Sequence, residues 1–209
     1  MSLIKKAFQI CKKEKRPALL TFTVAGDNTH KNSLEILKSI SPYVDICEMG
    51  MPHNTPVADG GQIQNCSHRA LKNGIKIKDI FKITNQYKKF KFAKPIILMG
   101  YFNTIKQFGE QNFINQCKKN KVDGLIVGKL KVAPKKIIQN YKKIKRLNKN
   151  KNVVIGFGIT EKTIASLKKA DGLVVGSALC KTITDSVNRR KKPAIAAKKM
   201  VMKLKSKIA

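Results

Sequence analysis

Tryptophan is absent from this chain, and acidic residues are scarce: 12 Asp and Glu stand against 44 Lys and Arg, which gives a formal net charge of +32. Arginine is scarce as well, since only five of the basic residues are arginine and the rest are lysines spread along the whole length. Arginine is favoured for bidentate contacts to phosphate and for reading base edges. Diffuse lysine therefore argues against specific nucleic-acid binding, although weak adsorption to polyanions at low salt is expected.

Paired cysteines and long apolar runs are also missing. The five cysteines are odd in number, widely separated and without a CxxC pair, so they indicate neither a disulfide framework nor a zinc site. No stretch approaches the roughly 18 apolar residues of a membrane span, and residues 1–17 lack the apolar core of a signal peptide. We therefore expect a soluble protein of the reducing cytoplasm, without a metal site.

What the chain does contain is a regular alternation of β-prone runs and helical patterns. Its 209 residues and 42% hydrophobic content suit a single domain over 1–209. Strands are expected where short apolar runs are bounded by turn residues, at 18–24, 44–47, 95–99, 122–128, 153–157 and 171–175. Helices are expected at 2–12, 32–40, 62–72, 77–90, 105–117, 134–144, 163–169 and 193–208. The N-terminal helix, in segment 1–16, should cap a core, and segment 193–209 should form a Lys-rich C-terminal helix.

This alternation indicates a parallel α/β architecture with right-handed crossovers, which can close in two ways. An open doubly wound sheet normally carries a glycine-rich phosphate fingerprint after its first strand, but residues 25–28, AGDN, do not match GxGxxG. A β/α barrel instead places functional groups after many strands. Candidate groups follow most of the expected strands, namely Asp27, Glu48, Tyr101, Gly158, Gly176 and Ser177. We therefore predict a reduced TIM-type β/α barrel with about six recognisable strands instead of eight.

Glycine-containing loops follow the last two expected strands, at 156–160 and 175–179. Glycine lets the backbone approach a ligand closely, and the free N–H groups at a helix start hold anions. In the last two loops of a barrel this pattern favours a phosphate ligand. The alternative is a pair of ordinary strand-end turns.

The stretch 45–65, DICEMGMPHNTPVADGGQIQN, contains two of the few carboxylates. Glu48 closes the second expected strand, and Asp59 lies in the Pro- and Gly-rich loop that follows. Two carboxylates at the mouth of one strand suggest general acid–base catalysis, while the alternative is a strand end with an Asx-type turn. His53 lies between them, but no second histidine has ligand spacing, so a solvated loop histidine is favoured over a metal ligand or a catalytic base.

Six segments carry a resemblance to a known family: LTFTVAGD (20–27), DICEMGMPHNTPVADGGQIQN (45–65), PIILMGYFN (95–103), VDGLIVG (122–128), IGFGIT (155–160) and ADGLVVGSAL (170–179). In this order they resemble the tryptophan synthase alpha chain, most specifically through E-x-G-x-P followed by P-x-A-D-G-x-x-I-Q. Members of that family are (βα)8 barrels that split indole-3-glycerol phosphate into indole and glyceraldehyde 3-phosphate. They pass the indole to a beta chain that carries pyridoxal phosphate (PLP).

By position, the resemblance implies that Glu48 protonates the indole C3 and that Asp59 holds and deprotonates the indole N–H. A carbon–carbon bond to an aromatic ring breaks readily only once that ring carbon is protonated, so the two roles agree chemically. The resemblance implies further binding residues, with core packing and ordinary turns as the alternative. These are Phe22, Tyr101, Ile126 and Phe157 at the indole pocket and Gly158, Gly176 and Ser177 at the phosphate.

The chain also departs from the family pattern. Such barrels usually have about 250 residues, and the loss falls between 128 and 153, where the family has two more strands and a mobile closing loop. Six strands cannot close with eight-stranded geometry unless tilt and shear change or one side stays open. In the opening loop, His53-Asn54-Thr55 replaces the usual Phe-Ser-Asp, which weakens the expected communication with the beta chain.

Two functional hypotheses follow from the resemblance and its gaps. The first is a lyase, with full or reduced activity, that needs no cofactor of its own and forms an alpha2beta2 complex with the PLP-bearing beta chain. The second is a catalytically decayed regulatory subunit that docks on the beta chain and activates it. The intact pair of Glu48 and Asp59 favours the first hypothesis, and the missing closing loop favours the second.

Overall fold

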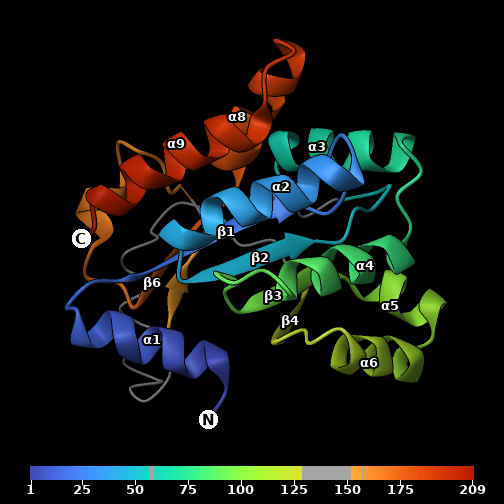
Figure 1. Ribbon diagram of the computed structural model, residues 1–209, viewed down its shortest axis with the longest axis horizontal. Helices are drawn as coiled ribbons and strands as arrows, with labels where there is room; N and C mark the ends of the chain where they lie inside the picture. Colours follow the sequence, from blue (N-terminus) through green and yellow to red (C-terminus); the bar gives the residue numbers. More distant parts are fainter. Residues whose placement is uncertain (57–58, 129–151, 157) are drawn as a thin grey trace.

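The computed structural model of the chain describes residues 1–56, 59–128, 152–156 and 158–209. Within these ranges six parallel strands form one sheet in the order β4-β3-β2-β1-β6-β5. The strands are β1 (Ala18–Val24), β2 (Ile46–Gly50), β3 (Ile96–Tyr101), β4 (Gly124–Gly128), β5 (Val154–Ile155) and β6 (Gly172–Val175). The sheet curls into part of a barrel, with helices around its outside (Figure 1). The predicted reduced β/α barrel is confirmed, and β4 and β5 are its edge strands among the described residues.

Helices connect these strands and cover the outer face of the sheet. Those described are α1 (Leu3–Lys13), α2 (His30–Ile40), α3 (Gly61–Lys72), α4 (Ile77–Lys88), α5 (Phe102–Phe108), α6 (Glu110–Lys119), α8 (Ser177–Asn188) and α9 (Pro193–Ser206), with the 3-10 turns η1 (Ser41–Tyr43) and η2 (Ile164–Leu167). Side-chain caps fix two helix starts: Ser2 accepts from the N–H of Lys5 at 3.3 Å, and Thr29 accepts from that of Asn32 at 3.0 Å. Across the described ranges, no helix is both long and apolar enough to cross a membrane.

The helical pattern differs from the sequence expectation in three places. The single helix expected over 105–117 is two helices, because Gly109 adopts a φ of 90° between α5 and α6. Helix α8 has no counterpart in the expectation, since its Thr, Ile and Val residues weaken the helical pattern, yet it forms with Leu179 and Ile183 buried in the core. Only the short turn η2 lies within 163–169, and the helix expected at 134–144 lies outside the described residues.

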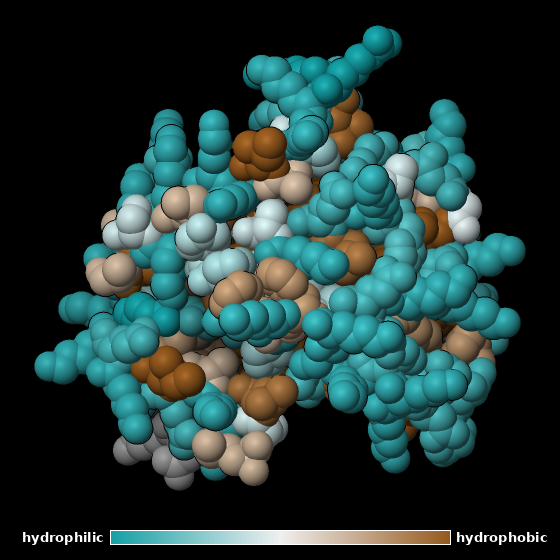
Figure 2. Space-filling view, viewed as in Figure 1, coloured by the Kyte–Doolittle hydropathy of each residue, from teal (hydrophilic) through white to brown (hydrophobic). Residues whose placement is uncertain are grey.

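Strands β1 and β2 are buried on both faces, which explains their continuous apolar sequences, whereas Leu125, Ile126 and Val127 of the edge strand β4 are 37–46% exposed. The outer faces pack under the helices in the largest apolar cluster, which includes Leu19, Cys47, Met49, Ile96, Leu98 and Leu173. Helix α9 lies alongside α2 and α8 over this layer (Figure 1). The outer surface of the helices is mainly hydrophilic in the view of Figure 2, as the abundance of lysine requires.

Helix α1 closes the end of the barrel at which the strands begin. Its apolar face packs against inward-facing strand residues in a second cluster, which contains Ile4, Ala7, Phe8, Cys11, Ala18, Leu20, Ile46 and Ile97. Two strand glycines leave room for the helix: a Cβ on Gly124 would lie 2.9 Å from Cδ1 of Ile4, and one on Gly172 would lie 3.1 Å from Cε1 of Phe8. The N-terminal helix therefore fills this end of the interior.

At the same end, an aspartate immediately precedes or opens three of the strands in the similar segments VDICEMG (44–50), VDGLIVG (122–128) and ADGLVVG (170–176). We call Asp45, Asp123 and Asp171 the N-terminal rim. Each rim carboxylate accepts a hydrogen bond from a backbone N–H at the start of the adjacent strand, and the donors are Leu19 at 2.8 Å, Ile96 at 2.7 Å and Val153 at 2.8 Å. These bonds hold each pair of adjacent strands in register.

Candidate active site

A cavity of about 580 Å³ lies inside the curled sheet, a volume within the range of small-molecule sites. Strand side chains alternate between the two faces of a sheet, so every second residue of each strand points inward. The register places Phe22 beside Glu48 and Glu48 beside Ile97. The next inward layer contains Val24, Gly50, Met99 and Ile126. The wall of the cavity is therefore mainly apolar.

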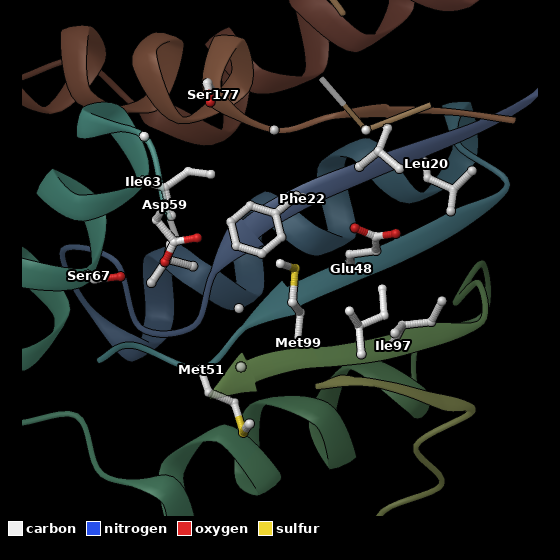
Figure 3. Close-up of a pocket in the computed structure, with 18 of the residues that line it drawn as sticks. Leu20, Phe22, Glu48, Met51, Asp59, Ile63, Ser67, Ile97, Met99 and Ser177 are labelled. Carbon is white, nitrogen blue, oxygen red and sulfur yellow. The ribbon is translucent and has the colours of Figure 1, made fainter. Parts of the chain in front are cut away.

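Glu48 of β2 points into this apolar interior, among Leu20, Phe22, Ile97 and Met99 (Figure 3). Its residue is 5% exposed, and among the described residues its carboxyl group has neither a hydrogen bond nor an ion pair. Burial raises the pKa of Glu48 to about 7. A carboxyl group with this pKa is partly protonated at neutral pH and can therefore donate a proton to a bound substrate.

Asp59 reaches the same cavity from the loop between β2 and α3. The hydroxyl of Tyr101, at the end of β3, donates to Oδ2 of Asp59 at 3.3 Å, and the side-chain amide of Gln64 donates to the Asp59 carbonyl at 2.9 Å. Burial raises the pKa of Asp59, while the hydrogen bond from Tyr101 acts in the opposite direction. The two cavity carboxylates therefore have different surroundings, as a division into proton donor and acceptor requires.

The N-termini of α3 and α8 meet at one end of the cavity. Gly60, Gly176 and Ser177 line it there, and a Cβ on Gly60 would lie 3.7 Å from Oγ of Ser177. Neither helix has a side-chain hydrogen bond at its N-cap, so N–H groups of the first turns remain for a ligand. Helix N-termini attract anions, so this end of the cavity suits a phosphate group.

Arg69 of α3 holds these two helices together behind the cavity. Its guanidinium donates to both carboxylate oxygens of Asp27, after β1, at 2.8 and 2.9 Å. It also donates to Oγ1 of Thr184 on α8 at 2.9 Å. A bidentate pair restricts orientation as well as distance. Arg69 therefore fixes α3 and α8 relative to β1.

Most of the predicted site residues come together in this cavity. Those that line it are Glu48, Asp59, Phe22, Tyr101, Ile126, Gly176 and Ser177. Gly158 does not line it: it has a φ of 71°, and its carbonyl accepts from Oγ1 of Thr163 at 2.6 Å in a local turn. Phe157 lies outside the described residues.

Further lining residues were not predicted, although a sequence signal for many of them exists. They include Leu20, Val24, Gly50, Met51, Ile63, Ser67, Ile97, Met99, Gly100, Val154 and Val174. Once Glu48 is placed inside, alternation along β2 and its neighbours selects Leu20, Val24, Gly50, Ile97, Met99, Val154 and Val174, but not Met51 or Gly100. The glycines are a second signal, because a Cβ on Gly50 would collide with Phe22 and one on Gly100 would collide with Met51. Ile63 and Ser67 come from α3, and only tertiary packing turns that helix face inward.

Within the described ranges, no group of three or more His, Cys, Asp or Glu residues is arranged to hold a metal ion. The cavity lining described here contains no lysine or arginine, although the chain has 44 of them. Backbone N–H groups and the two carboxylates are therefore the main charged or dipolar features of this lining.

Comparison with known proteins agrees with this geometry. The sequence profile of the tryptophan synthase alpha chain matches residues 8–141 and 128–209. The tryptophan synthase alpha chain of Pelagibacter ubique (strain HTCC1062) is 54% identical over 265 aligned positions, which cover 100% of both chains. The chain belongs to the tryptophan synthase alpha chain family. Family membership places it among the lyases of tryptophan biosynthesis.

Solved structures share the fold. Tryptophan synthase subunit alpha from Legionella pneumophila superposes with a TM-score of 0.88, covering 100% of this chain and 98% of the other, at 24% identity. A chain of the tryptophan synthase complex from Pyrococcus furiosus gives a TM-score of 0.77 at 26% identity, covering 90% of this chain and 98% of the other. The six-stranded sheet is thus similar to alpha-subunit barrels.

The comparisons also locate the difference in length between this tryptophan synthase alpha chain homologue and its relatives. The alignment with the Pelagibacter chain has 265 positions, whereas this chain has 209 residues. The two profile matches overlap at 128–141, directly after β4. The shortening therefore falls between β4 and β5, which are the two edge strands of the described sheet.

Proposed function

We propose that this chain catalyses the retro-aldol cleavage of indole-3-glycerol phosphate to indole and glyceraldehyde 3-phosphate. The observation that carries the proposal is Glu48, a carboxyl group buried without a described partner in an apolar cavity, where burial raises its pKa to about 7. Such a group is partly protonated at neutral pH and can deliver its proton to a ring carbon. Membership of the alpha chain family supports the same reaction.

In the proposed mechanism Glu48 protonates C3 of the indole ring, which makes the ring an electron sink for cleavage of the carbon–carbon bond. Asp59 accepts the indole N–H and stabilises the positive charge that develops on nitrogen. Both carboxylates line the cavity, and Tyr101 restrains Asp59. When the carbon–carbon bond breaks, its electron pair returns to the ring, the hydroxyl on the departing carbon becomes the aldehyde and gives its proton to the now ionised Glu48, and neutral indole forms with its N–H still hydrogen-bonded to Asp59.

The remaining cavity residues would bind the substrate. Phe22, Tyr101 and Ile126 would contact the indole ring, and the N–H groups at Gly176 and Ser177 would hold the phosphate. Phe157 is proposed as a further wall of the indole pocket and Gly158 as a further phosphate contact, on family resemblance alone. No cofactor is proposed for this chain.

We further propose that residues 1–209 act as one barrel domain that binds a PLP-bearing tryptophan synthase beta chain in an alpha2beta2 complex. The similarity to a chain of the Pyrococcus furiosus tryptophan synthase complex supports this partner. All five cysteines are buried free thiols, which suits a reducing compartment such as the cytoplasm.

A second candidate function is a regulatory subunit that docks on the beta chain and activates it without catalysis. The shortening between β4 and β5 favours this candidate, because closure over a substrate normally excludes water and completes the site. The two candidates share the partner and differ in whether Glu48 transfers a proton.

One assay separates the two candidates. The purified chain is mixed with its cognate beta chain and indole-3-glycerol phosphate, and release of glyceraldehyde 3-phosphate is followed for the native chain and for Glu48→Gln. Release that depends on Glu48 supports the lyase. Equal release from both, or none, refutes it, and activation of the beta reaction by Glu48→Gln would then establish the docking role.

A further inference from the structure

His53, in the loop after β2, is only partly exposed to solvent and makes contacts that its sequence context did not indicate. Its residue is half-buried, and its ring packs against Tyr101 with the ring centroids 4.8 Å apart and the planes tilted by 39°. The backbone N–H of Thr55 donates to Nδ1 of His53 at 3.0 Å, which fixes the orientation of the imidazole. The imidazole is therefore held in one place beside Tyr101.

Tyr101 connects this histidine to a cavity carboxylate. One side of its phenol contacts the His53 ring, and its hydroxyl donates to Oδ2 of Asp59 at 3.3 Å. The three side chains come from the loop after β2 and from the end of β3, so the contact between His53 and Tyr101 limits where the hydroxyl can point. A hydrogen bond of this length depends on such restraint, because small ring movements would break it.

The surroundings of Asp59 make this restraint important. Burial raises the pKa of Asp59, whereas the Tyr101 hydrogen bond acts to lower it. The ionisable groups that face Asp59 are Tyr101 from β3, His53 from the loop and Glu48 across the cavity on β2. The Tyr101 hydroxyl is a described side-chain donor that stabilises ionised Asp59.

We propose that His53 is a positioning residue for Asp59: its imidazole holds the Tyr101 phenol so that the hydroxyl keeps Asp59 an ionised acceptor for the ring N–H of the substrate. This inference rests on the proposed lyase function, in which Asp59 must be ionised to accept that N–H. His53 itself touches neither the substrate nor the reacting atoms; it acts through Tyr101.

The test compares His53→Ala, Tyr101→Phe and the double variant, with His68→Ala, an exposed histidine on α3, as the matched control. Loss of the Tyr101 hydroxyl removes a donor to the carboxylate, so Asp59 needs a higher pH to ionise, and the acid limb of kcat/KM moves up by about one pH unit. His53→Ala moves it in the same direction by about half as much. His53→Phe keeps an aromatic ring against Tyr101 and recovers part of the His53→Ala shift.

The double variant decides whether His53 acts through Tyr101. If it does, the double variant titrates as Tyr101→Phe alone does, because the link is already broken. Full addition of the two shifts would overturn the proposal, and so would a His53→Ala profile that matches His68→Ala.

The same titration is read independently of turnover from the carboxyl-carbon NMR shift of Asp59 in each folded variant. If glyceraldehyde 3-phosphate is not released at all, the proposed function fails, and the NMR titration still decides the role of His53. Unchanged Asp59 titration in His53→Ala refutes that role even in an active chain.

Discussion

The N-terminal rim and the cavity of this barrel differ in the partners of their carboxylates. At the rim, Asp45 accepts two hydrogen bonds from the Arg16 guanidinium, at 2.7 and 2.8 Å, and one from the N–H of Leu19. The Lys205 ammonium lies 3.5 and 3.3 Å from its two carboxylate oxygens. Burial alone would raise the pKa of Asp45, but these hydrogen bonds and charges hold it below its usual value. In the cavity, Glu48 has no described partner, and burial raises its pKa to about 7.

This difference separates stability from chemistry. A paired, ionised carboxylate ties strands and helices together, whereas an unpaired one is a source of instability that is tolerated where a proton must be held. The chain has 44 basic residues and only 12 acidic ones, yet the described cavity lining contains none of the basic ones. Exclusion of cations from the cavity is therefore a property of the fold rather than of the composition.

The largest effect is expected from removing the cavity carboxyl. Glu48→Gln should lower release of glyceraldehyde 3-phosphate by about 10²- to 10⁴-fold, because the proton donor is lost. The melting temperature should stay the same or rise, since a desolvated acid is replaced by a neutral amide. The exposed Glu110→Gln serves as the control and should keep native turnover. A Glu48→Gln variant that is fully active but less stable would show that Glu48 serves stability and not catalysis.

Loss of a rim carboxylate should lower the stability of the fold rather than the activity. Asp45→Ala removes the bidentate partner of the Arg16 guanidinium, whose side chain is only 9% exposed, and leaves it the half-exposed Glu14 alone as a carboxylate partner among the described residues. The free energy of unfolding should fall by about 3–5 kcal/mol, measured by urea denaturation. A loss below about 1 kcal/mol would show that water solvates the Arg16 guanidinium in place of the carboxylate, and that the rim is more accessible to water than the low exposure of its side chains implies.

The pH dependence of stability should have opposite signs for the two carboxylates. Between about 4.5 and 7 the folded chain holds a proton on Glu48 that the unfolded chain has lost, so this group makes the free energy of unfolding fall as pH rises. The slope is on the order of 1 kcal/mol per pH unit, and Glu48→Gln should remove it. Asp45 has a lowered pKa, so its stabilisation is present above the unfolded pKa and is lost as pH falls through the folded one. Urea denaturation of both variants across pH measures each contribution.

The smallest effect is expected for an ion pair outside both regions. Lys181 and Asp185 on α8 are 2.8 Å apart, and their side chains are 59% and 46% exposed. Lys88 and Asp123 at the rim are also 2.8 Å apart, but their side chains are only 11% and 13% exposed. Asp185→Ala should change the free energy of unfolding by less than about 0.5 kcal/mol. Asp123→Ala, in the same urea assay, should cost several times more. Equal costs would mean that distance, and not burial, determines the strength of these pairs.

Much of the fold could be read from the sequence because its signals are local. The apolar run at 18–24 forms β1, the run expected at 122–128 forms β4 over 124–128, and the apolar spacing of residues 3–10 forms the helix that fills the barrel end. Helix α8 could not be read in this way, because its β-branched residues mask the helical period and burial of Leu179 and Ile183 stabilises it. The break at Gly109 was missed because one glycine inside a periodic segment is compatible with either one helix or two.

The sequence by itself determined the alternation of strands and helices, the pairing of Glu48 with Asp59 in one stretch, and the family motif around them. Only the tertiary structure decided which partners those carboxylates have and how tightly they hold a proton. Tyr101 is 42 residues from Asp59, and Arg16 is 29 residues from Asp45, so no local pattern shows which carboxylate gains a partner. Proton affinity depends on burial and on nearby charges, and both are set only when the curled sheet brings distant segments together.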